Sequence, residues 1–167
     1  GEGSKFTVTL EYRIADKSYY EQDTEKSSDV DETDRISGKH ILLAEDNDLN
    51  AEIAQFILED MGLMVDRVED GVQCVSRIEQ KPAGTYDLIL MDIQMPNMDG
   101  YRATEMIRGL SDKSKATIPI IAMTANAFEE DRKKALAKGM NGHIAKPVDA
   151  EKVEKTICSV LGSQSEQ

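Results

Sequence analysis

Short apolar runs alternate with amphipathic stretches along the chain from Lys39 onward. A continuous apolar run bounded by Gly, Pro or acidic residues is typical of a strand that is buried on both faces. The strands expected on this basis are His40–Ala44, Leu63–Val68, Tyr86–Met91, Ile118–Met123 and His143–Ala145.

The stretches between these strands repeat their apolar residues at helical spacing, which predicts five helices. Gly62 is a typical residue at which the first of them ends, and Asp149 is the expected N-cap of the last. The apolar positions of the first helix are Leu49, Ile53, Phe56, Ile57 and Met61. The next three helices are expected at Val72–Gln80, Tyr101–Leu110 and Phe128–Lys138. The buried stripe of the last helix is expected to be Val153, Ile157, Val160 and Leu161.

Five strands that alternate with five helices predict a doubly wound α/β fold, (βα)5. Right-handed crossovers place helices on both faces of a parallel five-stranded sheet, which is a three-layer sandwich. We expect the flavodoxin-like strand order 2-1-3-4-5, one of the common orders of doubly wound sheets. Residues 39–162 have an ordinary size for one such domain with one sizeable core.

The first 38 residues are too few and too polar for a domain of their own. Phe6, Val8 and Leu10 alternate with polar residues, so residues 1–15 are expected to contain one amphipathic strand. A lone strand cannot satisfy its own backbone, so it is expected to belong to the sheet of another domain. Residues 16–38 are rich in Asp, Glu, Ser and Thr and are expected to form an acidic linker, and residues 163–167 a tail.

The charge of the chain excludes several functions. The formal net charge is -12 and the isoelectric point is near 4.6, which argues against a basic nucleic-acid-binding face. No apolar stretch is long enough to span a membrane, so no membrane contact is expected. Cys74 and Cys158 stand alone within helical stripes and are expected to be reduced thiols of the core.

Three acidic residues follow two of the predicted strands. Glu45 and Asp46 end the first strand, and Asp92 ends the third. In the order 2-1-3-4-5 these two strands are neighbours, so their carboxylates are expected to converge at the carboxyl edge of the sheet. Carboxylates at such a short distance repel one another, and a hard divalent cation, which prefers oxygen ligands, relieves the repulsion. The sequence therefore predicts a Mg²⁺ site.

Two further polar residues end the remaining strands at the same edge. Thr124 ends the fourth strand and Lys146 the fifth. Taken alone, a threonine there is a helix N-cap and a lysine a surface charge. Their position beside the predicted acidic cluster makes both candidates for the same site.

Four motifs at these strand ends resemble the receiver domain of two-component response regulators. They are Glu45-Asp46, the block from Met91 to Gly100, Ala122 to Ala125, and Lys146-Pro147. The resemblance extends from Lys39 to about Leu161, the whole predicted domain.

The resemblance implies a phosphoryl-accepting role for Asp92. Lys146 is then expected to pair with the phosphoryl oxygens, and Thr124 to donate its hydroxyl to them as a switch residue. In this family a Tyr or Phe that pairs with the threonine usually stands three residues before the lysine. His143 occupies that position here, so the chain departs from the usual aromatic switch at this residue.

The resemblance also implies a set of magnesium ligands. Asp46 and Asp92 are expected to bind Mg²⁺ directly, together with the backbone carbonyl of Gln94. Glu45 is expected to orient a water molecule on the metal.

Two features resemble receivers fused to sensor kinases and indicate a fragment of a hybrid histidine kinase. The acid pair, Glu45 and Asp46, is followed by Asn47, Asp48 and Asn50. Residues 1–10 look like the last turn and strand of a kinase ATP-binding domain. The implied partners are the phosphohistidine-bearing dimerisation domain of the parent chain and a downstream histidine phosphotransfer protein, in the cytoplasm. On this interpretation the fragment is expected to lack the kinase ATP site and to catalyse at most the phosphorylation and dephosphorylation of its own aspartate.

Other readings account for fewer residues. A flavodoxin-like electron carrier needs a phosphate-binding loop where this chain has Glu45-Asp46. A phosphatase of the haloacid-dehalogenase type needs an acid where Gln94 stands. A degenerate receiver that acts only as a docking module remains the alternative, against which the intact set of acids, Thr124 and Lys146 argues.

Overall fold

The structure is a computed structural model that describes residues 36–125 and 129–162 of the 167-residue chain. The strand predicted within residues 1–15, most of the predicted linker and the tail lie outside the described residues. Within the described helices, none has the length and apolar character needed to cross a membrane.

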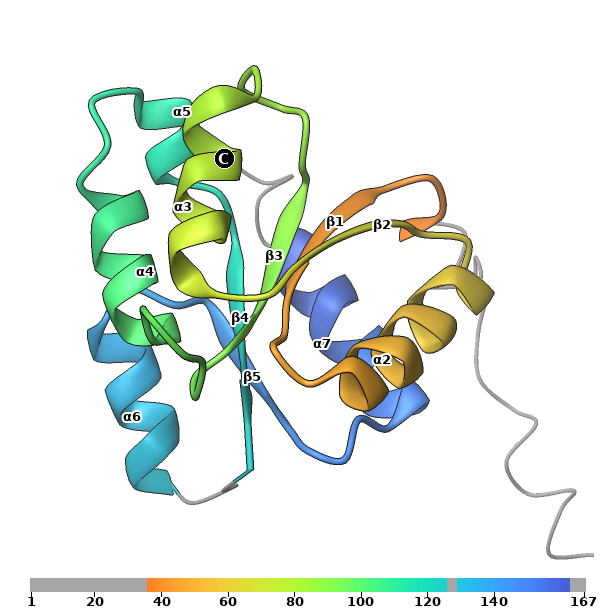
Figure 1. Cartoon of the computed structure of the whole chain (residues 1–167). Helices are drawn as coiled ribbons and strands as arrows, with labels where there is room; N and C mark the ends of the chain where they lie inside the picture. Colours follow the sequence, from red (N-terminus) through yellow and green to blue (C-terminus); the bar gives the residue numbers. More distant parts are fainter. Residues whose placement is uncertain (1–35, 126–128, 163–167) are drawn as a thin grey trace, which may run out of the picture.

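The described residues contain a five-stranded parallel sheet with the order β2-β1-β3-β4-β5, as predicted (Figure 1). The strands are β1 His40–Ala44, β2 Met64–Val68, β3 Leu88–Asp92, β4 Ile120–Thr124 and β5 Gly142–Ala145. β3 lies at the centre of the sheet and each of its residues is buried, which explains its uninterrupted apolar sequence.

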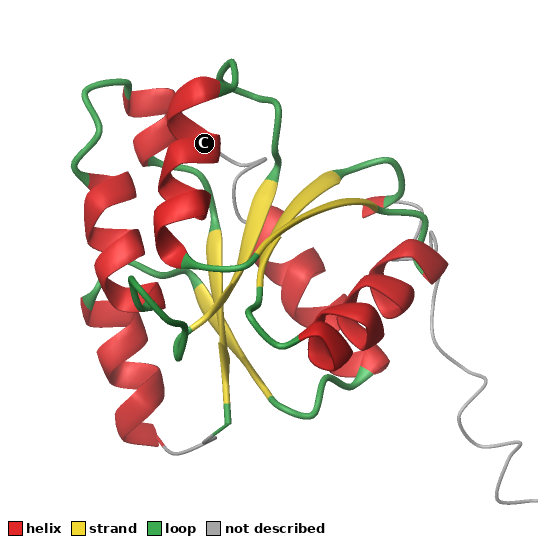
Figure 2. Cartoon of the chain, viewed as in Figure 1, coloured by secondary structure: helices red, strands yellow, loops and turns green. Residues whose placement is uncertain are grey.

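Helices cover both faces of the sheet (Figure 2). The helices α3 Gly71–Gln80, α4 Gly100–Arg108, α5 Lys113–Ala116 and α6 Glu129–Ala137 lie on one side. On the other side lie α2 Asp48–Asp60 and α7 Ala150–Gly162. The described residues thus form the predicted three-layer sandwich.

One helix was not predicted. α5 is a four-residue helix inserted between α4 and β4, so the strict alternation of one helix with one strand is wrong at this point. Asp112 begins it by accepting the backbone N–H of Ser114 at 3.0 Å. A helix this short has room for a single turn, so it leaves no apolar periodicity in the sequence.

Alternate residues of the strands pack into two separate cores. Leu42, Ile89 and Met91 pack with α3 and α4 on one side of the sheet. Leu43 and Leu90 pack with α2 and α7 on the other. This division follows from the two-residue period of a strand and requires both strand faces to be apolar.

Three helices begin at the carboxyl edge of the sheet with an acidic or amide N-cap. Asn47, Asp70 and Asp99 each accept the backbone N–H of the residue three positions on, at 3.0, 2.7 and 2.7 Å. Such caps contribute about 1 kcal/mol each. They fix the starts of α2, α3 and α4 next to the strand ends that carry the predicted site.

The apolar stripe of the first predicted helix faces outward in part. Leu49, Ile53 and Phe56 are 64%, 45% and 71% exposed, whereas α2 packs on the sheet through Ala51, Ala54 and Leu58. The spacing correctly predicted a helix, but it did not identify the buried face.

The packed domain extends slightly before the predicted boundary at Lys39. Ile36 is 1% exposed and packs in the core beneath α2 and α7, and the N–H of Gly38 donates to the carbonyl of Gly62 at 2.8 Å. The last residues assigned to the linker therefore contact the domain.

A second polar cluster ties β1, β2 and α3 together. The Asp66 carboxylate accepts the Tyr86 hydroxyl at 2.5 Å and lies 3.4 Å from the Arg77 guanidinium. His40 Nε2 is 3.6 Å from the other Asp66 oxygen, and its ring contacts that of Tyr86. The hydrogen bond from Tyr86 holds the pKa of Asp66 below its usual value.

Replacing Tyr86 with phenylalanine is expected to lower the free energy of unfolding by about 1 kcal/mol at neutral pH. A carboxyl with a lowered folded pKa stabilises the protein above its unfolded pKa and loses this effect as the pH falls through the folded pKa. The difference between wild type and Tyr86→Phe should therefore shrink below about pH 4. Urea unfolding across that range measures it, with Tyr101→Phe, outside the cluster, as the control. A difference that stays constant with pH would contradict the assignment.

Candidate functional site

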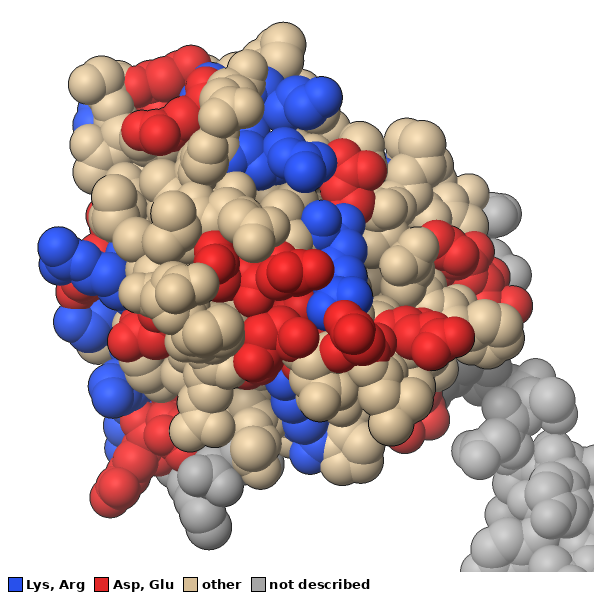
Figure 3. Space-filling view, viewed as in Figure 1, with Lys and Arg blue, Asp and Glu red and all other residues tan. Residues whose placement is uncertain are grey.

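Three carboxylates meet where β1 and β3 end. Oxygen atoms of Glu45, Asp46 and Asp92 lie within 4.8 Å of one another, so the predicted convergence is confirmed. Glu45 and Asp92 are buried, at 1% and 5% exposure, and Asp46 is exposed. Acidic side chains also gather in the middle of the face drawn in Figure 3, beside a strip of basic ones.

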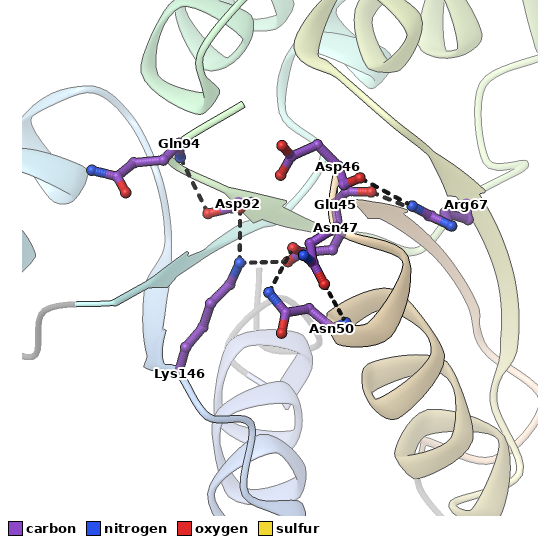
Figure 4. A network of polar contacts seen from close by, with 8 residues as sticks. All are labelled: Glu45, Asp46, Asn47, Asn50, Arg67, Asp92, Gln94 and Lys146. Carbon is purple, nitrogen blue, oxygen red and sulfur yellow. Dashed lines mark hydrogen bonds and ion pairs between the residues drawn. The ribbon is translucent and has the colours of Figure 1, made fainter. Parts of the chain in front are cut away.

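Lys146 joins the two buried carboxylates (Figure 4). Its Nζ lies 2.8 Å from Asp92 Oδ2 and 2.5 Å from Glu45 Oε2. Burial lowers the pKa of Lys146, but its bonds to Asp92 and Glu45 outweigh this and raise it above its usual value. Burial, helped by the nearby charge of Glu45, raises the pKa of Asp92 above its usual value, although the bonds from Lys146 and from the Gln94 N–H lower it.

The remaining oxygens of the buried carboxylates are held by α2 and by the loop after β3. Asn50 Nδ2 donates to Glu45 Oε1 at 3.1 Å, and the backbone N–H of Gln94 donates to Asp92 Oδ1 at 3.1 Å (Figure 4). Both carboxylates are thus fixed in orientation. The predicted ligand atom of Gln94, its carbonyl, stays a prediction.

The loop between Asp92 and α4 is anchored at its far end. Asn97, which has a positive φ of 61°, donates its side-chain amide to Asp70 at 2.8 Å, and the N–H of Gly71 donates to the carbonyl of Met98 at 3.1 Å. These contacts tie the loop to the start of α3. Asp70 accepts bonds from the Gln73 N–H and from Asn97, which lower the pKa of its carboxyl.

Thr124 and Lys146 lie at adjacent strand ends, as predicted. Thr124 is the half-buried last residue of β4, and its carbonyl accepts the N–H of Lys146 at 2.8 Å. The Lys146–Pro147 peptide bond is cis.

His143 lies in β5 opposite Ala122 and is half-buried. It lines a groove of about 320 Å³ between α6 and α7, together with Leu136 and Val160. The contact between His143 and Thr124 that a switch needs therefore stays a prediction.

The family comparison agrees with this geometry. The model of the response regulator receiver domain matches residues 41–158. The chain belongs to this family. Among curated relatives, the signal transduction histidine-protein kinase BarA of Escherichia coli K12 is 39% identical over 117 residues, or 70% of this chain. The sensor protein GacS of Pseudomonas syringae pv. syringae is 36% identical over 123 residues, or 73% of this chain. The chain spans only 12% and 13% of the length of these relatives.

Solved structures match almost over their full length. The receiver domain of the sensor histidine kinase PA1611 from Pseudomonas aeruginosa is 39% identical, with a TM-score of 0.67, and the match covers 75% of this chain and 99% of that one. That structure has a magnesium ion coordinated in its active-site cleft. The receiver domain of yeast Ssk1, solved with the histidine phosphotransfer protein Ypd1, is 28% identical, with a TM-score of 0.68 and coverages of 77% and 92%.

The residues of this receiver fit a small divalent cation. Three carboxylates and one ammonium leave two net negative charges in the cluster. Glu45 and Asp92 are held by protein donors, while Asp46 is exposed beside them. An oxygen-only cluster that is open to solvent on one side is typical of Mg²⁺ sites.

Two residues of the site were missed at the sequence level. Asn50 was noted only for its family resemblance, and no role was assigned to Arg67, which contacts the acid pair from β2. Asn50 lies in the first turn of α2, directly after the acid pair, so its contact could have been expected. The contact of Arg67 depends on the register between β1 and β2, which no local pattern reveals.

Proposed function

We propose that this receiver accepts a phosphoryl group from a phosphohistidine onto Asp92, with Mg²⁺ as cofactor. The arrangement of Asp92 carries the proposal. A carboxylate at a rigid strand end has an ammonium at 2.8 Å and two further acids beside it. Phosphoryl transfer depends mainly on positioning and on neutralising charge, and this cluster can do both.

The transfer uses the residues in distinct roles. An oxygen of Asp92 forms a bond to phosphorus as the phosphorus–nitrogen bond of the donor breaks. Lys146 offers its charge to the phosphoryl oxygens. Asp46, Asp92 and the carbonyl of Gln94 would hold Mg²⁺, which neutralises phosphoryl charge when bound, and Glu45 would contact it through water.

The response of the domain would begin at Thr124. In the proposal, its hydroxyl moves to the phosphoryl oxygens once Asp92 is modified. This movement would shift the domain between two arrangements. His143 would occupy the place that the threonine leaves, with a polar ring where the family usually has an aromatic one.

The exposed face of α2 supports a helical protein as the donor. Leu49, Ile53 and Phe56 form an apolar stripe that begins one turn after the acid pair, on the helix that also supplies Asn50 to the site. An amphipathic partner helix can pack along such a stripe. We propose that the phosphohistidine domain of a parent hybrid kinase, or a histidine phosphotransfer protein, docks here. Both would act in the cytoplasm, where ATP is available to charge the histidine.

Intact-mass spectrometry after incubation with acetyl phosphate tests the function. The wild-type domain is expected to gain the mass of one phosphoryl group with Mg²⁺ and none after chelation, because the cluster alone keeps two net negative charges next to the anionic donor. If no gain occurs in either condition, the docking-module alternative is favoured.

Replacing Phe56 with alanine tests the donor surface. Loss of a central aromatic anchor is expected to slow phosphoryl transfer from a phosphohistidine protein by about 30-fold, corresponding to roughly 2 kcal/mol. The rate with acetyl phosphate, which needs no docking surface, should stay unchanged. Val72→Ala is the matched control, since Val72 is also apolar and exposed but lies on α3. Equal transfer rates for the two variants would exclude α2 as the docking face.

A further inference from the structure

Arg67 donates hydrogen bonds to the backbone of the acid pair, on the side away from Asp92 and Lys146. It lies in β2, and its Nε donates to the carbonyl of Glu45 at 3.1 Å (Figure 4). Its Nη2 donates to the carbonyl of Asp46 at 3.4 Å and to the carboxylate of Asp48 at 2.8 Å. One planar guanidinium therefore contacts two consecutive carbonyls and the first residue of α2.

These hydrogen bonds fix the backbone conformation of Glu45 and Asp46 directly after β1. The N–H of Glu45 donates to the carbonyl of Val68 at 3.0 Å, so the pair is bonded to the end of β2 as well as to Arg67. The carbonyls of Glu45 and Asp46 face Arg67, while their carboxylates lie near Asp92. A guanidinium suits this task because its donors form a rigid fork.

We propose that Arg67 is a positioning residue for the divalent cation. The inference rests on the proposed function, because it concerns the same metal site. Groups outside the ligand set that orient the ligands commonly change metal affinity by about 10- to 100-fold when removed. Arg67 acts through the backbone of the acid pair and contacts neither metal nor phosphoryl group.

The positive charge of Arg67 and its hydrogen bonds are expected to change Mg²⁺ affinity in opposite directions. The sign of the change in the variants therefore shows which of the two dominates. A cation close to the cluster repels Mg²⁺, so loss of the charge alone would strengthen metal binding. Loss of the hydrogen bonds from Arg67 would let the acid pair move and would weaken Mg²⁺ binding. The positioning role therefore predicts that Arg67→Ala binds Mg²⁺ more weakly, by about 10- to 100-fold.

Titration calorimetry with Mg²⁺ alone measures the dissociation constant for the wild type and four variants. Arg67→Lys keeps the charge but cannot reach three acceptors with one ammonium, so it should also bind more weakly. Asp48→Asn removes an exposed ion pair and leaves both carbonyl bonds, so its effect should be a few-fold at most. Arg77→Ala is the matched control, because Arg77 pairs with Asp66 and Tyr86 instead of the acid pair.

Each outcome separates the possibilities. Unchanged or tighter binding by Arg67→Ala and Arg67→Lys, with Arg77→Ala like the wild type, overturns the positioning role. If Arg67→Ala does not fold, as judged by circular dichroism, Arg67→Lys decides on the same criterion. If the wild type itself binds no Mg²⁺, the proposed function fails and this inference fails with it.

Discussion

Asp92→Asn is expected to abolish the Mg²⁺-dependent gain of a phosphoryl group. The amide nitrogen is not nucleophilic, and the substitution also removes one of the three negative charges that favour the cation. Lys146 keeps its contact with Glu45, so the surrounding site stays assembled. The measurement is intact mass after acetyl phosphate treatment, under conditions in which the wild type is fully modified.

The loss should not arise from unfolding. Burial holds the pKa of Asp92 above its usual value, so the ionised side chain costs stability at neutral pH and its neutral replacement is expected to fold. Asp60→Asn, at the exposed end of α2, is the matched control and should gain mass like the wild type. A mass gain in Asp92→Asn equal to that of the wild type would mean that another residue is the acceptor.

Gly100→Ala is expected to lower the free energy of unfolding by about 3 kcal/mol, the upper end for overpacked positions. A β-carbon at this position would collide with the backbone carbonyl oxygen of Asp92 and would lie 2.9 Å from Met91 Cγ. The backbone of β3 cannot move without breaking its ladder to β1 and β4. The start of α4 must shift instead, taking with it the bond from the Gly100 N–H to the carbonyl of Ile93.

The same substitution should also slow phosphorylation by acetyl phosphate, because losing the bond from Gly100 to the carbonyl of Ile93 loosens the residue directly after Asp92. Urea unfolding and initial phosphorylation rates measure the two effects. Gly162→Ala is the control, since no atom lies within 4 Å of the β-carbon it adds. Equal unfolding midpoints for the two variants would show that the contact at Gly100 relaxes without cost.

The sheet could be predicted because its strands are short and continuously apolar. A run such as Leu88 to Met91 needs apolar neighbours on both faces, and the interior strands of a parallel sheet covered by helices provide them. The convergence of Glu45, Asp46 and Asp92 then followed from strand order alone. The positions of Thr124 and Lys146 at the same edge followed in the same way.

The outward stripe of α2 could not be predicted from spacing. Helical periodicity places Leu49, Ile53 and Phe56 on one face, but α2 packs against the sheet through two alanines and Leu58. Small residues let the helix approach the strands closely, and the larger apolar residues remain exposed. Spacing alone therefore predicted the helix without showing which of its apolar residues are buried.

The sequence alone predicted the fold, the edge of the sheet at which the polar residues lie, and the residues Asp92, Lys146, Glu45 and Asp46 that meet there. Periodicity indicates the strands, and the strand order typical of doubly wound sheets brings their ends together. Only the tertiary structure revealed that Lys146 bridges Glu45 and Asp92, and that Arg67 grips the acid pair from β2. Such contacts depend on register and side-chain reach between segments far apart in the chain, and no local pattern encodes them.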